Sequence, residues 1–474
     1  MRPGRREIAL ACVLLSACST GGGDVRNRSL YDGADVVTTV QDPGIQAVKA
    51  EVRTLPFKHL EWEYSLSRHR IRRMTVSGNF VFVETPTAEV LAIDRYVGEV
   101  KWIYRVDTDT PLDFPPVVAH GVPEMILKLE KDLVAVNRDI DQIIKERGPG
   151  KESQEKQKER SEKREALKVA QFGDNVYFLS RQVLYCLDRE SGTLRWSHRL
   201  EFVPGTQPFA TQFYVFIGAA DFSRVYVLSV KDRGSILDFF RADIQADENQ
   251  ITARPVYEDP VLYFGSHDGK VYFYSVRDRK RGNPVQTGGP IMAEPVIHRF
   301  RYRTTEPDKE NAGKTKEVER EGKALLVGSA DNAFYSIEAA SGQLLWRYEC
   351  AGPIKTAAVA KDLTVYVKTE DGALFALNVM PLHNQADPSS WRRSGEMRWK
   401  IPLGERFLMK GKQYVYVLGP RKEIYAMNEM MGDLAGRYPT RHLQFLVTNT
   451  ADDLFYCANS GGHIFALRES KEEY

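Results

Sequence analysis

Residues 184–196 read Leu184-Tyr-Cys-Leu-Asp188-Arg-Glu-Ser-Gly192-Thr-Leu-Arg-Trp196, and this segment decides the fold because the chain repeats it. Similar segments occupy residues 90–102 and 334–346, each with a glycine four residues before a tryptophan. Apolar and polar residues alternate around the glycine, as in half-buried β-strands. The glycine supplies a left-handed turn conformation between two strands. A unit of this size that recurs along a chain indicates a propeller or a solenoid.

The ends of the chain complement each other. Residues 60–66 resemble the last strand of a unit, whereas residues 441–467 supply three strands and lack the fourth. Pairing these two segments closes a ring and removes unpaired sheet edges. The sequence therefore predicts an all-β, eight-bladed propeller of four-stranded antiparallel blades, closed by an N-terminal strand. Seven blades is the alternative, because the third and seventh units, 205–243 and 404–438, match the repeat weakly. The units lie near 71–106, 164–200, 205–243, 250–288, 290–349, 353–402, 404–438 and 441–467.

The first residues have the features of a targeting segment. Arg2, Arg5 and Arg6 precede a short apolar run that cannot span a bilayer. The sequence Leu15-Ser-Ala-Cys18 follows, and it resembles the lipobox of bacterial lipoproteins, which are cleaved before the cysteine and acylated on it. We therefore predict a lipoprotein signal peptide at 1–18 with lipidation at Cys18, an ordinary signal peptide being the alternative. Residues 19–56 are expected to form a flexible tether and residues 57–474 the propeller.

The repeated units, in the form Leu-Tyr-Ala-Leu-Asp-x-x-Thr-Gly-x-x-x-Trp, resemble those of the pyrroloquinoline-quinone-like propeller superfamily. The resemblance covers about 60–467 and implies that a tryptophan of each blade packs against the neighbouring blade. The superfamily contains quinoprotein dehydrogenases and also non-enzymatic proteins, among them a lipoprotein subunit of the outer-membrane β-barrel assembly machinery. Five tryptophans match the blade-packing position: Trp62, Trp102, Trp196, Trp346 and Trp399.

The lipobox, the tether and eight units with little else resemble the non-enzymatic kind. We expect a lipid-anchored protein at the periplasmic face of the outer membrane, which binds other envelope proteins as a scaffold in outer-membrane protein assembly. Its partners would be the membrane, which it reaches through the lipid, and those envelope proteins. Outside its complex with them, the protein would be a monomer. The alternatives are a quinone-dependent dehydrogenase and a propeller that recognises envelope polysaccharide.

The sequence offers no catalytic residue, cofactor site or metal site. The chain has no adjacent cysteine pair, and its nine histidines show no ligand spacing. A formal net charge of +2 argues against a broad nucleic-acid surface. The remaining mature cysteines, Cys186, Cys350 and Cys457, are expected to be buried free thiols.

Residues 123–168 interrupt the strands and are predicted to form a helical hairpin at the start of the second blade. Apolar residues recur at spacings of 3 and 4 and form a seam on one face of the helix 123–147. The charged stretch 151–165 offers no matching seam, so the seam is expected to cover either the outer wall of the propeller or a groove on a partner. A further polar insert, 301–323, is expected to be a solvated loop. The candidate docking residues are Ile126, Leu129, Leu133, Val136, Ile140 and Ile143.

Overall fold

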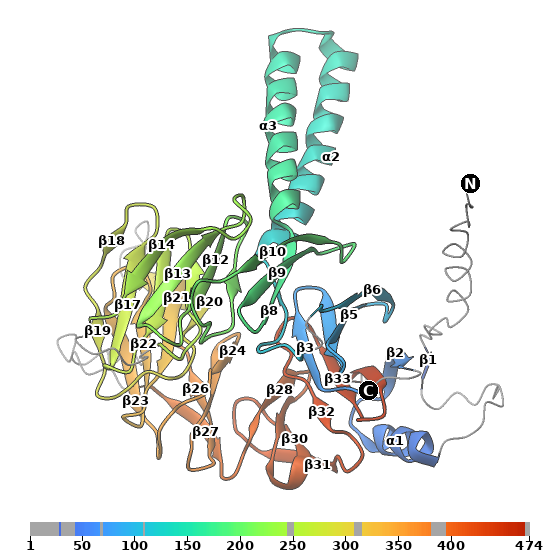
Figure 1. The fold of residues 1–474 in the computed structure, drawn as a ribbon, viewed down its shortest axis with the longest axis vertical. Coiled ribbons are helices and arrows are strands. Elements are labelled where there is room, and N and C mark those ends of the chain that lie inside the picture. Colours follow the sequence, from blue (N-terminus) through green and yellow to red (C-terminus); the bar gives the residue numbers. More distant parts are fainter. Residues whose placement is uncertain are drawn as a thin grey trace, which may run out of the picture.

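The computed structural model describes residues 28–29, 43–66, 70–107, 110–243, 251–307, 315–380 and 395–469. In these residues the strands form eight antiparallel sheets around a ring, and a pair of helices projects from it (Figure 1). The predicted eight-bladed propeller is therefore confirmed, and the seven-bladed alternative is wrong.

Seven blades are built from strands that follow one another in the chain, the first strand nearest the axis. Blades 1 and 2 contain β3 (Arg73–Ser77), β4 (Phe80–Glu84), β5 (Glu89–Asp94), β6 (Val100–Arg105), and β7 (Val117–Val118), β8 (Asn175–Ser180), β9 (Val183–Asp188), β10 (Leu194–Arg199). Blades 3 and 4 contain β11 (Phe209–Ala210), β12 (Tyr214–Gly218), β13 (Arg224–Ser229), β14 (Ile236–Arg241), and β15 (Val256–Glu258), β16 (Val261–Gly265), β17 (Lys270–Ser275), β18 (Lys280–Arg281), β19 (Val285–Gln286). Blades 5 and 6 contain β20 (Val296–Pro307), β21 (Thr315–Gly328), β22 (Ala333–Glu338), β23 (Leu344–Glu349), and β24 (Val359–Lys361), β25 (Thr364–Lys368), β26 (Leu374–Asn378), β27 (Met397–Ile401). Blade 7 contains β28 (Arg406–Lys410), β29 (Val415–Leu418), a 3-10 turn (Pro420–Lys422), β30 (Glu423–Met427) and β31 (Leu434–Pro439).

Blade 8 closes the ring by joining the two ends of the chain. It contains β32 (Phe445–Leu446), β33 (Leu454–Ala458) and β34 (His463–Arg468), with β2 (His59–Ser65) as its fourth strand. Tyr64 lies opposite Ile464 in the antiparallel pair of β2 and β34. A short strand, β1 (Arg28–Ser29), pairs with the outer edge of β2. The predicted closure by the N-terminal strand is confirmed.

The repeated glycine and tryptophan meet across neighbouring blades. Gly98 has a φ of 75°, and a Cβ atom there would stand 2.6 Å from the ring of Trp62 in the preceding blade. A Cβ atom at Gly192 would stand 2.3 Å from the ring of Trp102. The buried indole N–H groups donate hydrogen bonds to carbonyl oxygens of the next blade: Trp62 to Arg95 (2.8 Å), Trp102 to Arg189 (2.8 Å), Trp346 to Val379 (2.8 Å) and Trp399 to Glu429 (2.9 Å). Trp196 packs against the turn at Gly234.

Blades 3 and 7 keep the register of the repeat although they lack its tryptophan. In blade 2 Trp196 lies opposite Cys186, beside a register shift in the strand pair. Asp238 of blade 3 and Gly436 of blade 7 occupy the corresponding positions beside the same shift. The backbone geometry of the repeat therefore persists where its largest side chain is missing.

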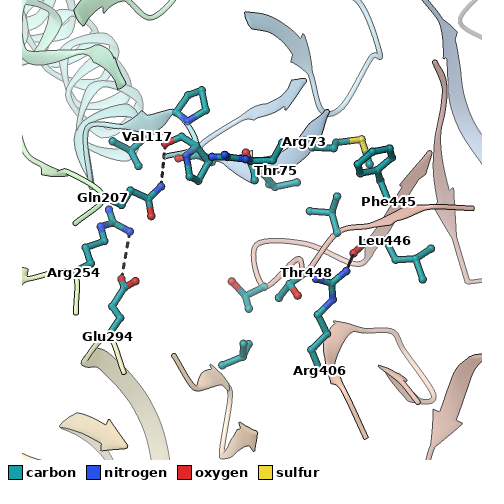
Figure 2. A pocket seen from close by; sticks show the side chains of 18 of the residues that line it. Arg73, Thr75, Val117, Gln207, Arg254, Glu294, Arg406, Phe445, Leu446 and Thr448 are labelled. Carbon is teal, nitrogen blue, oxygen red and sulfur yellow. Dashed lines mark hydrogen bonds and ion pairs between the residues drawn. The ribbon is translucent and has the colours of Figure 1, made fainter. Parts of the chain in front are cut away.

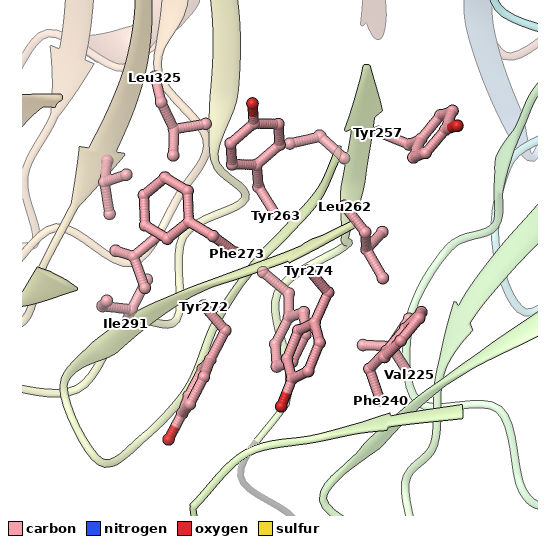
Figure 3. Packing of buried hydrophobic residues seen from close by; sticks show 14 of the residues in the cluster. Val225, Phe240, Tyr257, Leu262, Tyr263, Tyr272, Phe273, Tyr274, Ile291 and Leu325 are labelled. Carbon is pink, nitrogen blue, oxygen red and sulfur yellow. The ribbon is translucent and has the colours of Figure 1, made fainter. Parts of the chain in front are cut away.

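Tyrosine hydroxyl groups reach the next blade where blades 4 and 7 have no such tryptophan. Tyr263 donates a hydrogen bond to the carbonyl oxygen of Ala339 at 2.9 Å, and Tyr416 donates to the carboxylate of Glu469 at 2.6 Å. Between blades 3 and 4, the rings of Phe240 and Tyr274 lie 4.6 Å apart, within an aromatic cluster (Figure 3). These contacts replace the large buried surface of the indole.

The expected tether over 19–56 needs correction at its C-terminal end. Residues Pro43–Thr54 form a helix, α1, whose Val48 and Val52 are buried against blades 7 and 8. The carboxylate of Glu51 accepts hydrogen bonds from the backbone N–H groups of His442 and Leu443 at 2.7 and 3.3 Å. Because its apolar residues lie four apart on one face, this amphipathic helix packs on the ring instead of remaining extended. The predicted signal peptide and most of the tether lie outside the described residues.

The expected loop at 301–323 is wrong for the residues that the structure describes. β20 and β21 continue past the blade as a two-stranded ribbon, paired as far as Pro307 and Thr315. Arg301 lies opposite Glu321, and their side chains form an ion pair of 3.0 Å. Opposite charges facing each other across strands stabilise a ribbon that has little apolar surface.

The contact between Trp62 and Gly98 generates a prediction for the closing blade. Trp62→Ala should lower the free energy of unfolding by roughly 3–5 kcal/mol, as for other buried aromatic residues. Gly98→Ala should also destabilise the protein, but much less in the Trp62→Ala background, because the steric conflict is then gone. Urea denaturation of the two single variants and the double variant measures this coupling.

Gly121→Ala is the matched control. Gly121 has a φ of 72°, and no atom lies within 4 Å of the position that a Cβ would take. Alanine at this position therefore introduces the same kind of backbone strain as at Gly98, but no steric conflict. Additive effects of Trp62→Ala and Gly98→Ala would show that the two residues do not depend on each other.

Candidate functional site

A hollow of about 800 Å³ lies on the axis of the ring, between the innermost strands of several blades (Figure 2). Its charged lining comes from three sides. Arg72 and Arg73 stand at the start of β3 in blade 1, Arg254 precedes β15 in blade 4, and Arg406 begins β28 in blade 7. Glu294 is the acidic residue of the lining. The fold therefore brings together arginines that are far apart in the sequence.

Arg72 and Arg73 share one buried carboxylate. The guanidinium nitrogens of these residues lie 3.1 and 3.5 Å from the carboxylate oxygens of Glu84, which is 3% exposed. Both arginines also donate hydrogen bonds to the carbonyl oxygen of Leu112, at 3.0 and 3.3 Å. Burial raises the pKa of Glu84 to about 7, although the two arginines oppose the shift. Near neutral pH, one partly ionised carboxylate therefore faces two positive charges.

Arg254 and Arg406 are only partly neutralised. Arg254 donates a hydrogen bond to Glu294 at 3.3 Å, and its buried Nε has no hydrogen-bond partner among the described residues. Burial raises the pKa of Glu294 even though Arg254 opposes the shift. Arg406 donates to the backbone carbonyl of Leu446, and within the described part of the chain no carboxylate forms an ion pair with it. The surrounding walls lower the pKa of its guanidinium by desolvation.

A second hollow, of about 810 Å³, adjoins the first between the β20–β21 ribbon and the β24–β25 turn. The two hollows share Ala360 and Thr450 in their linings. Arg299 and Lys323 of the ribbon both approach the carboxylate of Glu258, the latter at 2.5 Å. The excess of basic side chains therefore continues outward from the axis along the ribbon.

The helical insert is a hairpin of α2 (Val122–Arg147) and α3 (Lys151–Gly173), which lie side by side and project from blade 2 (Figure 1). At its base, Ile126 and Leu129 pack with Leu167 and Ala170 of α3 and with residues of blades 2 and 3. Farther out, Val136 and Ile140 are buried, and Leu133 and Ile143 are half-buried. Two of the six candidate docking residues, Ile126 and Leu129, therefore pack on the propeller at the base of the hairpin, and the other four are buried or half-buried on α2.

The charged helix α3 lies beside α2 and pairs with it through two lysines (Figure 1). Lys156 and Lys163 are half-buried, and their ammonium groups lie 3.2 and 3.0 Å from the carboxylates of Asp139 and Asp132 on α2. The aliphatic stem of a lysine can lie along apolar surface while its charged end stays in water. A stretch without apolar residues can in this way provide the partner that the seam requires.

Several predicted features fall outside the candidate site. Cys18 lies outside the described residues. Cys186, Cys350 and Cys457 are buried and unpaired. In the described ranges, none of the helices is long and apolar enough to cross a membrane.

Comparison with known proteins relates the chain to one family. The model of outer membrane protein assembly factor BamB matches residues 46–237 and 308–381, which is more than half of the chain. The crystal structure of BamB from Moraxella catarrhalis is similar with a TM-score of 0.53 and 12% sequence identity, over 86% of this chain and 99% of that chain. The computationally designed Ika8 protein has a TM-score of 0.47 and 14% identity, over 85% and 98%. No curated protein sequence matches the chain. At these identities the structural likeness concerns the fold alone.

The axial arginines were missed by the sequence analysis. A signal was present, since Arg73 and Arg406 each begin the first strand of a unit and Arg254 precedes one by two residues. Alignment of the units on these first strands would have placed the three side chains around the axis.

The raised pKa of Glu294 generates a prediction for the pH dependence of stability. In the folded protein Glu294 keeps its proton at pH values above its ordinary pKa of 4.5, so unfolding in that pH range releases the proton. This contribution to stability is present below the ordinary pKa and is lost as the pH rises through the raised value. Glu294→Gln cannot lose a proton and should therefore lose less stability than the wild type as the pH rises from about 4.5 through the raised pKa, measured by urea denaturation. The exposed Glu162→Gln is the control, and equal pH profiles for all three proteins would contradict the prediction.

The hairpin seam generates a further prediction. Leu133→Glu with Ile140→Glu should unwind the hairpin, at a cost of about 1 kcal/mol or more for each side chain, while the propeller keeps its own unfolding transition. Circular dichroism at 222 nm and limited proteolysis between residues 122 and 173 measure the loss of helix. Leu127→Glu with Val134→Glu is the matched control, because these side chains are 58% and 52% exposed on the same helix. Equal loss of helix in both double variants would show that the seam has no special role.

Proposed function

Because the chain belongs to the family of outer membrane protein assembly factor BamB, we propose that it is a non-enzymatic scaffold for outer-membrane protein assembly. The observation that carries this proposal is the family match over residues 46–237 and 308–381. In this role the protein binds other envelope proteins and holds them in place, without converting a substrate itself.

The architecture supports a scaffold role. Neighbouring blades contact one another through buried side chains, and four of the junctions also have the indole hydrogen bond of Trp62, Trp102, Trp346 or Trp399. A ring connected in this way holds its loops at fixed positions, and loops on a rigid frame are where binding surfaces usually lie. The projecting hairpin and the ribbon add surface beyond the ring (Figure 1).

The proposal includes the site of action. The lipobox at residues 15–18 supports acylation of Cys18, and the lipid would hold the ring at the periplasmic face of the outer membrane. Membrane attachment through one lipid leaves the propeller free to contact proteins that insert into that membrane.

Removal of the protein from its cell tests this function. We expect the amount of folded β-barrel proteins in the outer membrane to fall, seen as a loss of heat-modifiable bands on gels. A wild-type copy should restore these bands, and the same tagged copy should co-purify with outer-membrane assembly proteins from detergent-solubilised membranes. A Cys18→Ser copy should leave the membrane fraction and restore the bands poorly. Unchanged β-barrel levels together with no co-purified assembly protein would refute the proposal.

A further inference from the structure

The axial hollow has an excess of positive charge that the rest of the chain does not have. The whole chain balances 66 basic residues against 64 acidic ones. The lining of the axial hollow contains four arginines and one carboxylate, that of Glu294. The carboxylates of Glu84, Asp113 and Glu405 act on the arginines from outside this lining. Like charges gathered in a partly enclosed space repel one another, and an incoming anion relieves this repulsion.

The arginines also have hydrogen-bond donors to spare. A guanidinium carries five N–H donors in a fork that matches a carboxylate. Nε of Arg254 has no partner among the described residues. Arg406 donates to a single backbone carbonyl in the described structure. These two side chains, with Arg73 on a third side of the hollow, lie around its open centre (Figure 2).

The shape and the remaining lining favour an extended chain over a compact ion. The axial hollow of about 800 Å³ lies beside the second hollow of about 810 Å³, and Ala360 and Thr450 line both. Between the arginines the lining includes the apolar side chains of Val296, Val359 and Phe445, beside polar ones such as Thr75 and Gln207. The innermost strands β3, β24 and β32 are edge strands of their sheets, so they have backbone groups available for a peptide.

We propose that the axial hollow binds an extended acidic segment of a partner protein, in which aspartate or glutamate alternates with apolar residues. The carboxylates would pair with Arg73, Arg254 and Arg406, and the apolar side chains would contact the walls between them. This inference rests on the proposed function, because it names the chemistry by which the scaffold recognises a partner.

A binding measurement with the full mature chain tests the inference. The probe is a fluorescently labelled ten-residue peptide of alternating aspartate and valine, followed by fluorescence polarisation. The variant Arg73→Gln with Arg254→Gln and Arg406→Gln should bind it at least about tenfold more weakly, because three charge-assisted hydrogen-bond sites are lost. Glu294→Gln, which removes a competing carboxylate, should bind it more tightly than the wild type. Added salt should weaken binding of the wild type more than that of the triple variant.

Matched controls separate this site from general charge. Arg147→Gln with Arg277→Gln and Arg279→Gln removes the same charge from side chains that are 70%, 72% and 71% exposed, and should bind the peptide like the wild type. A peptide of alternating asparagine and valine should not bind. The inference is overturned if the two triple variants bind alike, if Glu294→Gln weakens binding, or if citrate or inorganic phosphate alone binds as tightly as the peptide. Equal unfolding midpoints of the two triple variants confirm that both are folded. If one of them is not folded, the effect of Glu294→Gln on peptide binding tests the inference instead.

The outcome is distinguishable from failure of the proposed function. A protein that maintains β-barrel levels but does not bind the acidic peptide overturns this inference and leaves the scaffold role in place. A protein that binds the peptide but has no effect on β-barrel levels overturns the scaffold role and leaves the peptide-binding site in place.

Discussion

The structure depends on one contact, which recurs at five of the eight blades: the indole of one blade lies against a glycine of the next. A Cβ atom at Gly192 would stand 2.3 Å from the ring of Trp102, so the turn must lack a side chain for the ring to lie where it does. The same indole donates its N–H to the carbonyl oxygen of Arg189 in that blade. The tryptophan and the glycine, by which the repeat is recognised in the sequence, are therefore the two sides of one interface between blades. Blades of a repeat protein contact only their neighbours, and this interface is what makes them a ring.

Variation in this contact shows which part of it is essential. Tyr263 and Tyr416 lie on the second strand of their blades, yet their hydroxyl groups reach the next blade just as an indole N–H does elsewhere. The polar link between blades is thus retained although the residue that makes it has moved to another strand. At the junction of blades 7 and 8, α1 adds apolar contacts, and Phe57 stacks on Phe455 with ring centroids 4.5 Å apart.

The ring and its closure could be predicted because both follow from local pattern. Residues 90–102, 184–196 and 334–346 each contain a complete hairpin signal, and the incomplete units at the two ends complement each other.

Other features could not be predicted, because they depend on partners that are distant in the sequence. The face of α1 that carries Val48 and Val52 is too short to stand out by itself, and only the ring shows what it covers. The seam of α2 was visible, but its partner was not, because α3 pairs with α2 through charged residues such as Lys156 and Lys163, which form no apolar pattern. The axial arginines come from three units, so only the closed ring brings them together.

Closure by β2 also sets an order in time. Ser65 and His463 form a hydrogen bond across a separation of 398 residues, so β2 must wait until β34 has been made. Contacts between residues so distant in sequence form slowly, because the intervening chain must first be organised. Until then β2 has no β34 to pair with, and the half-built ring remains open to mispairing with other chains. The period between synthesis of β2 and arrival of β34 is therefore when this protein is most in need of protection by chaperones.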